Sequence, residues 1–241
     1  TQDPERALPL AQAVVVAKLH NQATVLRRHR EALGAQGQRA LETLEAQLTR
    51  AREAADLDTL RGHEGSGAAA YFGAWPALVD TGKWHFEGRA YHPPPDPINA
   101  MLSLGYTLLL HDIIGAVYRI GLDPDIGFFH VLDYGRPSLA LDLEEEFRPI
   151  IVDTLVLNLL QLEVLQPADF HQEEGARPRS LMTDDARRFF LARYEQRLGV
   201  RTRHPGWDQL LTYRQCIERQ VEHLARCIIG RDPAYEPLLI D

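Results

Sequence analysis

The sequence has 241 residues, 45% of them hydrophobic, which is enough for one large domain or for a lobe with a small second one. Its net charge of −8 is unexpected for a protein that binds nucleic acid, but the charge is unevenly spread. Residues 121–185 hold 14 acidic side chains against 4 arginines, whereas residues 186–232 hold 10 arginines against 5 acidic side chains. The sign of the net charge therefore does not exclude an anionic ligand.

Two features place the protein in a reducing compartment and outside a membrane. Cys216 and Cys227 lie on one expected helix, roughly 16 Å apart along its axis, which is too far for a disulfide. We therefore expect reduced thiols in a cytoplasmic protein. The sequence opens without the pattern of a secretory signal, and its most apolar run, Ile98–Leu110, is too short to span a bilayer. No membrane partner is expected.

Helical periodicity runs through nearly the whole chain, and strand signals are almost absent. The spacing and cap residues predict helices at about Leu8–Arg30, Gln38–Ala55, Leu57–Trp75, Ile98–Ile120, Ser138–Leu165, Thr183–Leu198 and Trp207–Ile229, with a polar loop over Gln166–Leu181. The helix that follows Asp96 and Pro97 is apolar nearly all round and should be the buried centre of a bundle. Pro149 should bend the helix that contains it. These patterns predict one all-α domain over residues 1–241.

The stretch Gly127–Pro149 concentrates side chains suited to chemistry. It contains one histidine and a group of carboxylates at the start of an apolar helix, namely His130, Asp142, Glu144, Glu145 and Glu146. Because residues three and four apart share a helix face, Asp142 should face the same way as Glu145 and Glu146. An imidazole with two or three carboxylates is a ligand set suited to Mn²⁺ or Mg²⁺. A solvent-exposed acidic helix start that favours the helix dipole explains the same residues.

A further carboxylate, Glu64, lies on an expected helix that is rich in glycine. Gly62, Gly65 and Gly67 surround it, and each glycine inside a helix costs about 1 kcal/mol relative to alanine. This pattern indicates the close approach of another backbone or a ligand, or tight helix packing. Glu64 would then join His130 and the carboxylates around one divalent ion, which would polarise a phosphodiester. An ordinary salt bridge to Arg61 is the simpler explanation of Glu64.

Two other groups of residues are candidate sites, and a protein without catalytic activity is a further alternative. His111-Asp112 is the dipeptide of metal-dependent HD phosphohydrolases, which need two further His or Asp ligands on neighbouring helices. Glu218, Glu222 and His223 suit a solvated face of the last helix. The sequence contains no glycine-rich phosphate loop, nucleophile elbow or zinc spacing, so a helical interaction module without catalytic activity is a further alternative.

Four segments in the same order closely resemble the CRISPR adaptation integrase family, the metal-dependent endonucleases and integrases that insert new spacers into CRISPR arrays. The segments are AKLHNQATVLRRH (17–29), LRGHEGSGAAAYF (60–72), PPPDPINAMLSLGYTLL (93–109) and IGFFHVLDYGRPSLALDLEEEFRP (126–149). The resemblance covers about Ala7–Leu239. It implies a helical catalytic lobe in which the 3′-hydroxyl of a captured DNA end attacks a phosphodiester at the repeat boundary.

Carried over residue by residue, the resemblance implies a Mg²⁺ or Mn²⁺ ion held by Glu64, His130 and Glu145, with Asp142 as a catalytic ligand or as a support of the ligands. It assigns four further motif residues to DNA binding or to bracing the site, namely Arg61, Asn99, Arg136 and Arg148.

The implied partners are prespacer and repeat DNA, a second copy of the chain in a homodimer, and a small ferredoxin-like CRISPR adaptation protein. Fusion to, or association with, a reverse transcriptase or a nuclease is also implied. Members of the family normally begin with a β-rich lobe that mediates dimerisation. Because this sequence begins within the helical lobe, we expect that the β-rich lobe is missing ahead of Thr1.

Overall fold

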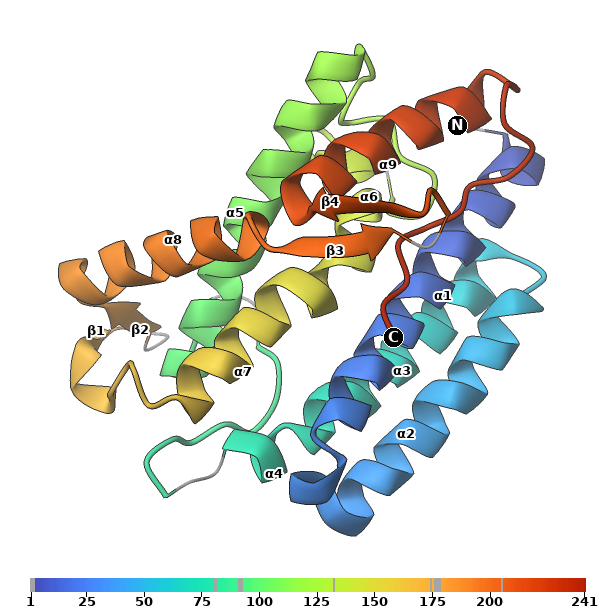
Figure 1. Cartoon of the computed structure of the whole chain (residues 1–241). Helices are drawn as coiled ribbons and strands as arrows, with labels where there is room; N and C mark the ends of the chain where they lie inside the picture. Colours follow the sequence, from blue (N-terminus) through green and yellow to red (C-terminus); the bar gives the residue numbers. More distant parts are fainter. Residues whose placement is uncertain are drawn as a thin grey trace.

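The structure, a computed structural model, describes residues 3–79, 82–90, 93–131, 133–173, 175, 179–204 and 206–241; Thr1, Tyr91-His92 and Leu132 of the segments discussed above lie outside these ranges. Helices predominate (Figure 1). The elements are α1 (Pro4–Arg28), α2 (Arg30–Arg52), α3 (Leu57–Ala74), α4 (Pro76–Val79), α5 (Pro97–Ile120), α6 (Ser138–Arg148), the π-helix Pro149–Asp153, α7 (Thr154–Gln161), the 3-10 helix Pro167–Asp169, β1 (Phe170–Glu173), β2 (Arg179–Met182), α8 (Asp184–Leu198), β3 (Arg201–His204), β4 (Gln209–Thr212) and α9 (Tyr213–Ile228).

Helix α5 is the central helix, as the sequence predicts. It begins where Asp96 caps it, because the Asp96 Oδ1 atom accepts the Asn99 amide at 2.8 Å. It ends at Gly121, whose φ of 85° favours glycine. By length and composition α5 is apolar enough to cross a membrane, with a mean hydropathy of 1.5, but half of that apolar window is buried inside the protein. Its contacts with α6, α7, α9 and β2 make it the core helix of the fold.

Helices α1, α2 and α3 pack against one another on one side of the molecule (Figure 1). The break expected near Gly34 is present, since Gly34 has φ 55° and ψ −146° within α2. At Gly67, an added Cβ atom would lie 2.2 Å from Leu19 Cδ2, so α3 can approach α1 this closely only with glycine there. Tight packing therefore explains Gly67. This contact brings Glu64, one turn earlier on α3, next to Lys18 on α1.

The expected single helix from Ser138 to Leu165 is divided at Pro149. Proline lacks the amide that would continue the helical hydrogen bonds, and the chain passes through the five-residue π-helix before α7 begins. The backbone amide and the hydroxyl of Thr154 both donate to the carbonyl of Pro149, the hydroxyl at 2.9 Å, which closes the π-helix. The interruption lies directly after the acidic cluster.

The all-α prediction is wrong, because the described residues include two antiparallel hairpins. Strands β1 and β2 pair with Phe170 opposite Met182, inside the segment expected to be a loop. Strands β3 and β4 pair with Arg201 opposite Thr212, so α9 begins at Tyr213 and not near Trp207. Four-residue strands are too short for a two-residue periodicity to be visible in the sequence. In β4, Leu210 also fits the apolar stripe of the helix that follows.

The C-terminal segment runs back along α1 (Figure 1). The side-chain amide of Asn21 on α1 donates to the carbonyl of Leu238 at 2.9 Å, and its oxygen accepts the amide of Ile240 at 3.1 Å. The same Asn21 amide donates to the carbonyl of Glu146 on α6 at 2.9 Å. A single buried side chain thus joins α1, α6 and the C-terminal segment beside the acidic cluster.

Candidate metal centre

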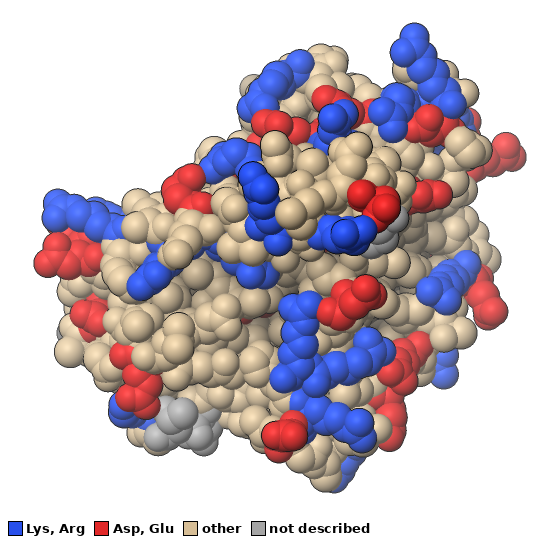
Figure 2. All heavy atoms as spheres, viewed as in Figure 1, with Lys and Arg blue, Asp and Glu red and all other residues tan. Residues whose placement is uncertain are grey.

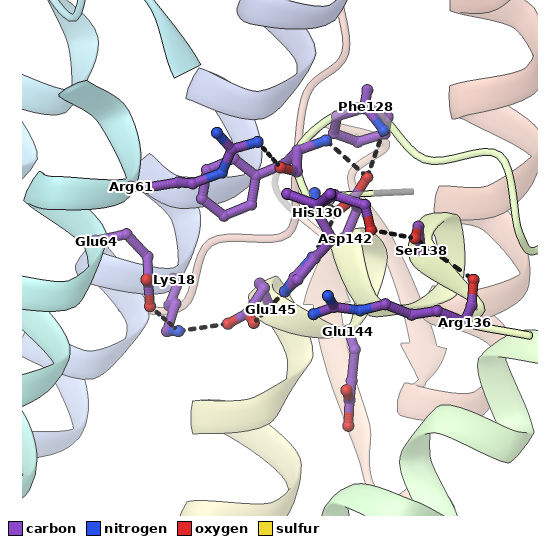
Figure 3. Close-up of polar contacts among 12 residues, drawn as sticks. Lys18, Arg61, Glu64, Phe128, His130, Arg136, Ser138, Asp142, Glu144 and Glu145 are labelled. Atoms are coloured by element: carbon purple, nitrogen blue, oxygen red, sulfur yellow. Dashed lines mark hydrogen bonds and ion pairs between the residues drawn. The ribbon is translucent and has the colours of Figure 1, made fainter. Parts of the chain in front are cut away.

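Two carboxylates from different helices meet at one ammonium group. Glu64 on α3 and Glu145 on α6 both form ion pairs with Lys18 on α1, the Glu145 pair at 2.5 Å (Figure 3). The Lys18 and Glu145 side chains are 7% and 3% exposed, while Glu64 is 21% exposed and thus open to solvent on one side. A positive charge therefore already lies between the two carboxylates.

His130 reaches the same carboxylate from the loop between α5 and α6. Its Nε2 atom lies 3.8 Å from Glu145 Oε1, and its Nδ1 atom lies 2.6 Å from Asp142 Oδ1. Because a carboxylate only accepts hydrogen bonds, Nδ1 carries the hydrogen, and Nε2 faces Glu145. A histidine oriented by a carboxylate in this way is the usual arrangement of a metal ligand.

Asp142 holds the loop that carries His130. Its Oδ2 atom accepts the amides of Phe128 and Phe129 at 2.6 and 3.0 Å, and its Oδ1 atom accepts the amide of His130 at 2.8 Å. A Cβ atom added at Gly127 would lie 2.6 Å from Asp142 Oδ2, so glycine is required there for the loop to come this close. Asp142 therefore positions the imidazole through both the backbone and the ring.

The charge of Glu145 is strongly compensated. Burial alone would raise its pKa, but Arg148, Lys18 and His130 lower the pKa to about 2. Arg148 Nη1 donates to Glu145 Oε1 at 2.7 Å, and the Lys18 ammonium pairs with the buried Oε2 atom at 2.5 Å. Burial would also lower the pKa of Lys18, but Glu145 and Glu64 more than offset this and raise it. The groups that could hold a metal ion are His130 Nε2 and the carboxylates of Glu64 and Glu145, and Lys18 lies between the two carboxylates. This donor set fits Mg²⁺ or Mn²⁺.

The neighbouring glutamates do not join this group. Glu144 pairs with Arg148 at 2.7 Å, and burial raises its pKa to about 7. Glu146 was expected on the face of Asp142, but it points to the C-terminal segment, where it accepts from the hydroxyl of Tyr235 at 2.6 Å and the amide of Leu238 at 2.9 Å. Burial raises the pKa of Glu146 to about 7 as well.

The other motif residues brace the surroundings. Arg61 does not pair with Glu64: it donates to Asp58 Oδ1 at 2.6 Å and to the carbonyl of Phe129 at 2.6 Å, next to His130. Asn99 donates to Asp96 and Gly88 and accepts from Arg89 and Ala90, so it fastens the loop before α5 and lies apart from the carboxylates. Arg136 is exposed, and its carbonyl accepts the Ser138 amide at 2.7 Å.

The His111-Asp112 pair does not form a metal site among the described residues. His111 is exposed, and its Nδ1 atom lies 2.7 Å from the carbonyl of Thr107 on its own helix. Asp112 accepts from Tyr194 on α8 at 2.6 Å and from Arg214 on α9 at 2.8 Å. Asp112 therefore links three helices, and the two side chains of the dipeptide serve different partners.

A second group of ligand-type atoms lies near the end of α9. Atoms of His223, Cys227 and Asp232 lie within 4.8 Å of one another. However, His223 Nδ1 lies 2.9 Å from Asp232, His223 Nε2 accepts the Glu236 amide at 3.0 Å, and Arg226 donates to Asp232 at 2.7 Å. Both imidazole nitrogens are thus engaged in holding the C-terminal segment. The sequence predicts a solvated helix face for Glu218, Glu222 and His223, but His223 is buried. Glu218 pairs with Arg119 and Glu222 pairs with Arg219 on the surface.

A cavity of about 350 Å³ opens beside Glu64, lined by Ala68, Ala69 and Gly73 of α3 and by Glu87, Gly88 and Arg89 of the loop before α5. Gly65 also lines it, and a Cβ atom added there would meet nothing within 4 Å. On the face shown in Figure 2, basic side chains lie in separate groups with acidic ones among them. Because Glu64 lines this cavity, it is the carboxylate that a ligand from solvent reaches first.

Comparisons with known proteins identify the family of this chain. The family profile described as "CRISPR associated protein Cas1" matches residues 1–196. A CRISPR-associated endonuclease Cas1 of Thermus thermophilus is 40% identical over 238 residues, covering 99% of this chain and 68% of that protein. A Cas4/Cas1 exonuclease–endonuclease fusion of Geobacter sulfurreducens is 36% identical, covering 97% of this chain and 43% of the fusion. A solved Cas1 structure from Thermotoga maritima has a TM-score of 0.79 at 26% identity, covering 95% of this chain and 70% of that one.

Fold, site and relatives together define a nuclease and integrase of CRISPR adaptation. The chain belongs to the family of CRISPR-associated protein Cas1. The predicted family and functional class are thereby confirmed. A casposase bound to its integration product shares the fold with a TM-score of 0.88 at 23% identity. The comparisons give no support to the expectation of a missing β-rich lobe ahead of Thr1: they match 95% and 100% of this chain and 70% of each of the two solved structures.

The sequence analysis did not assign Lys18 to the site. One signal was available: only two lysines occur among 26 basic residues, and Lys18 lies in the first of the four family segments. A lone lysine on a buried helix face needs a compensating carboxylate, but the sequence does not say which one.

Proposed function

We propose that residues 1–241 form one catalytic domain that holds Mg²⁺ or Mn²⁺ on Glu64, His130 and Glu145 and joins DNA 3′-hydroxyl ends to a CRISPR repeat by transesterification. The observation that carries the proposal is that Glu64 from α3 and Glu145 from α6 meet at the Lys18 ammonium, while Nε2 of His130 from the α5–α6 loop lies 3.8 Å from Glu145. Asp142 supports the site by orienting His130.

The reaction exchanges one phosphodiester for another. A bond forms between phosphorus and the 3′-oxygen of the incoming DNA end, and the bond from phosphorus to the 3′-oxygen of the target strand breaks. The incoming hydroxyl loses a proton to solvent, and the departing oxygen gains one. A bound divalent cation would stabilise the negative charge that builds up on the phosphate oxygens.

The chain's own residues prepare this chemistry. Glu145, with its lowered pKa, is ionised at neutral pH and can hold a cation. Arg148 fixes Glu145 from the protein side, and its guanidinium packs 4.9 Å from the ring centroid of Tyr106. Arg61 holds the backbone at Phe129 and so fixes the loop that presents His130. The cavity beside Glu64 provides an approach for a DNA backbone.

We propose partners of the kinds that the relatives' names and titles state. One solved relative is part of a "Cas6-RT-Cas1--Cas2 complex", and others are fused to a Cas4 exonuclease. We therefore propose prespacer and repeat DNA, a second copy of this chain, a small ferredoxin-like adaptation protein and, by fusion or association, a reverse transcriptase or nuclease. The site of action would be the cytoplasm, where the CRISPR array lies.

The test is a strand-transfer assay on a supercoiled or branched repeat DNA with Mn²⁺, comparing wild type, Glu64→Gln and the exposed control Glu31→Gln. Glu64→Gln should lower the rate at least about 100-fold, more than the loss of a residue that only supports a ligand. Calorimetric titration with Mn²⁺ should show binding to wild type and to the control but not to Glu64→Gln. Equal activity and equal Mn²⁺ binding in wild type and Glu64→Gln would refute the proposed site.

A further inference from the structure

Lys18 is unusual because its ammonium joins the two carboxylates that the proposed metal would share. It lies on α1, buried, and contacts Glu64 from α3 and Glu145 from α6 (Figure 3). The second lysine, Lys83, forms an exposed ion pair with Glu163 at 2.6 Å. The same residue type is therefore present in the chain in a surface pair that has no connection to the site.

The contacts of Glu145 leave one position for a cation. Its Oε1 atom accepts from Arg148 and faces His130 Nε2, while its Oε2 atom is buried and meets the Lys18 ammonium at 2.5 Å. Lys18 also reaches Glu64, the carboxylate that lines the cavity. The ammonium between these two carboxylates lies where a divalent ion bridging them would bind, so the two cations compete for that place.

A buried ion pair that only joins helices is an expensive way to stabilise a fold, because desolvation opposes the attraction. The position of Lys18 has a second consequence. Without a cation, Glu64 and Glu145 would repel each other across a poorly hydrated space. An ammonium keeps them together, and the divalent ion then arrives at carboxylates that are already in place.

Resting on the function proposed above, we infer that Lys18 is the resident cation of the metal site: it holds Glu64 and Glu145 before the metal binds, leaves them when it binds, and so lowers the affinity for the metal. Removing its charge should have two opposite effects. Lys18→Met should melt at a lower temperature than wild type without metal. It should bind Mn²⁺ at least tenfold more tightly, which corresponds to about 1.4 kcal/mol.

The presence of only two lysines allows a direct measurement on the wild-type protein. With ¹³C-labelled lysine, the two side-chain signals are assigned with Lys18→Met and Lys83→Met and then followed during a Mg²⁺ titration. We expect the Lys18 signal to move and to saturate with the Mg²⁺ dissociation constant measured by calorimetry, while the Lys83 signal stays in place. In Glu64→Gln the Mg²⁺-dependent movement should disappear.

The outcomes separate the two proposals. Mg²⁺ binding by calorimetry with an unmoved Lys18 signal would overturn the role of Lys18 and leave the metal site intact. Absence of any Mg²⁺ or Mn²⁺ binding to wild type would overturn the metal site and the role of Lys18 with it. If Lys18→Met is folded and binds Mn²⁺ with wild-type or lower affinity, Lys18 is a structural ion pair and the inference is wrong. Lys83→Met, the matched control, should bind Mn²⁺ as wild type does.

Discussion

Glu145 and Glu146 are neighbours on α6, both almost completely buried, and yet they behave in opposite ways. Cationic partners lower the pKa of Glu145 to about 2, whereas burial raises the pKa of Glu146 to about 7. Glu145 is surrounded by Arg148, Lys18 and the His130 ring. The two side chains have different partners, Glu145 at the candidate metal centre and Glu146 at the C-terminal segment.

The difference lies in the kind of partner and not in the depth of burial. Glu146 accepts from the Tyr235 hydroxyl, the Leu238 amide and the Gln220 amide, the last at 3.2 Å, and all three are neutral. Neutral donors satisfy the oxygens but leave most of the desolvation of the charge uncompensated. A buried carboxylate is thus available to a cation when cations already surround it, and serves as a structural acceptor when neutral groups do.

The largest expected effect concerns the pH dependence of stability. Because burial raises the pKa of Glu146 from its ordinary value of 4.5 to about 7, its stabilising contribution is fully present below pH 4.5 and is lost as the pH rises through 7. Glu146→Gln removes this loss. The free energy of unfolding of the variant, relative to wild type, should therefore rise by up to roughly 3 kcal/mol between pH 4 and pH 8.

Urea unfolding at several pH values measures this effect, with the exposed Glu31→Gln as the matched control. Glu144, whose pKa is about 7, and Asp153, whose pKa burial raises to about 6, add slopes of the same sign, and both are present in wild type and in the variant. A difference between Glu146→Gln and wild type that is the same at pH 4 and pH 8 would contradict the contrast between the two glutamates.

The next effect concerns the residues of α6 that face the candidate metal centre. Asp142→Asn keeps the size of the side chain but replaces an acceptor oxygen by a donor. Each Asp142 oxygen accepts two hydrogen bonds, so either the Phe128 and Phe129 amide contacts or the two His130 contacts must be lost. Since the ring of His130 is then poorly oriented, the Mn²⁺ affinity should fall about 10- to 100-fold. Calorimetry measures it, with Asp125→Asn, an exposed residue near the same loop, as control. An unchanged affinity in a folded variant would show that Asp142 does not position His130.

Several helix boundaries and part of the candidate site were predictable, because their determinants are local. The caps at Asp96 and Thr183, the stop at Gly121 and the interruption at Pro149 depend on residues a few positions away and were found where expected. The sharing of a face by Asp142 and Glu145 also follows from helix geometry, and His130 contacts both. The glycines around Glu64 and the family motifs both indicated Glu64 as a candidate ligand.

What the sequence could not supply are the pairings between distant segments. Helix geometry places Glu146 near the same face as Asp142, but Tyr235, 89 positions later, draws it to the opposite side. Lys18 meets Glu64 across 46 positions. The two hairpins depend on pairing between strands of only four residues, so neither has a periodic signature. In each case a contact between remote residues decided the structure, and local propensity carries no information about it.

The smallest effect asks whether the two sides of α6 are independent. Tyr235→Phe removes the hydroxyl that donates to Glu146 Oε1 and accepts from Gln220 at 3.0 Å, and it keeps the ring that stacks on His223. The loss should lower the free energy of unfolding by about 1 kcal/mol, the net value of a typical hydrogen bond. Mn²⁺ affinity should be unchanged, because Glu145 keeps Arg148, Lys18 and His130. A variant that loses Mn²⁺ affinity along with stability would mean that the C-terminal segment sets the position of Glu145, so the two carboxylates would have to be treated as one coupled unit.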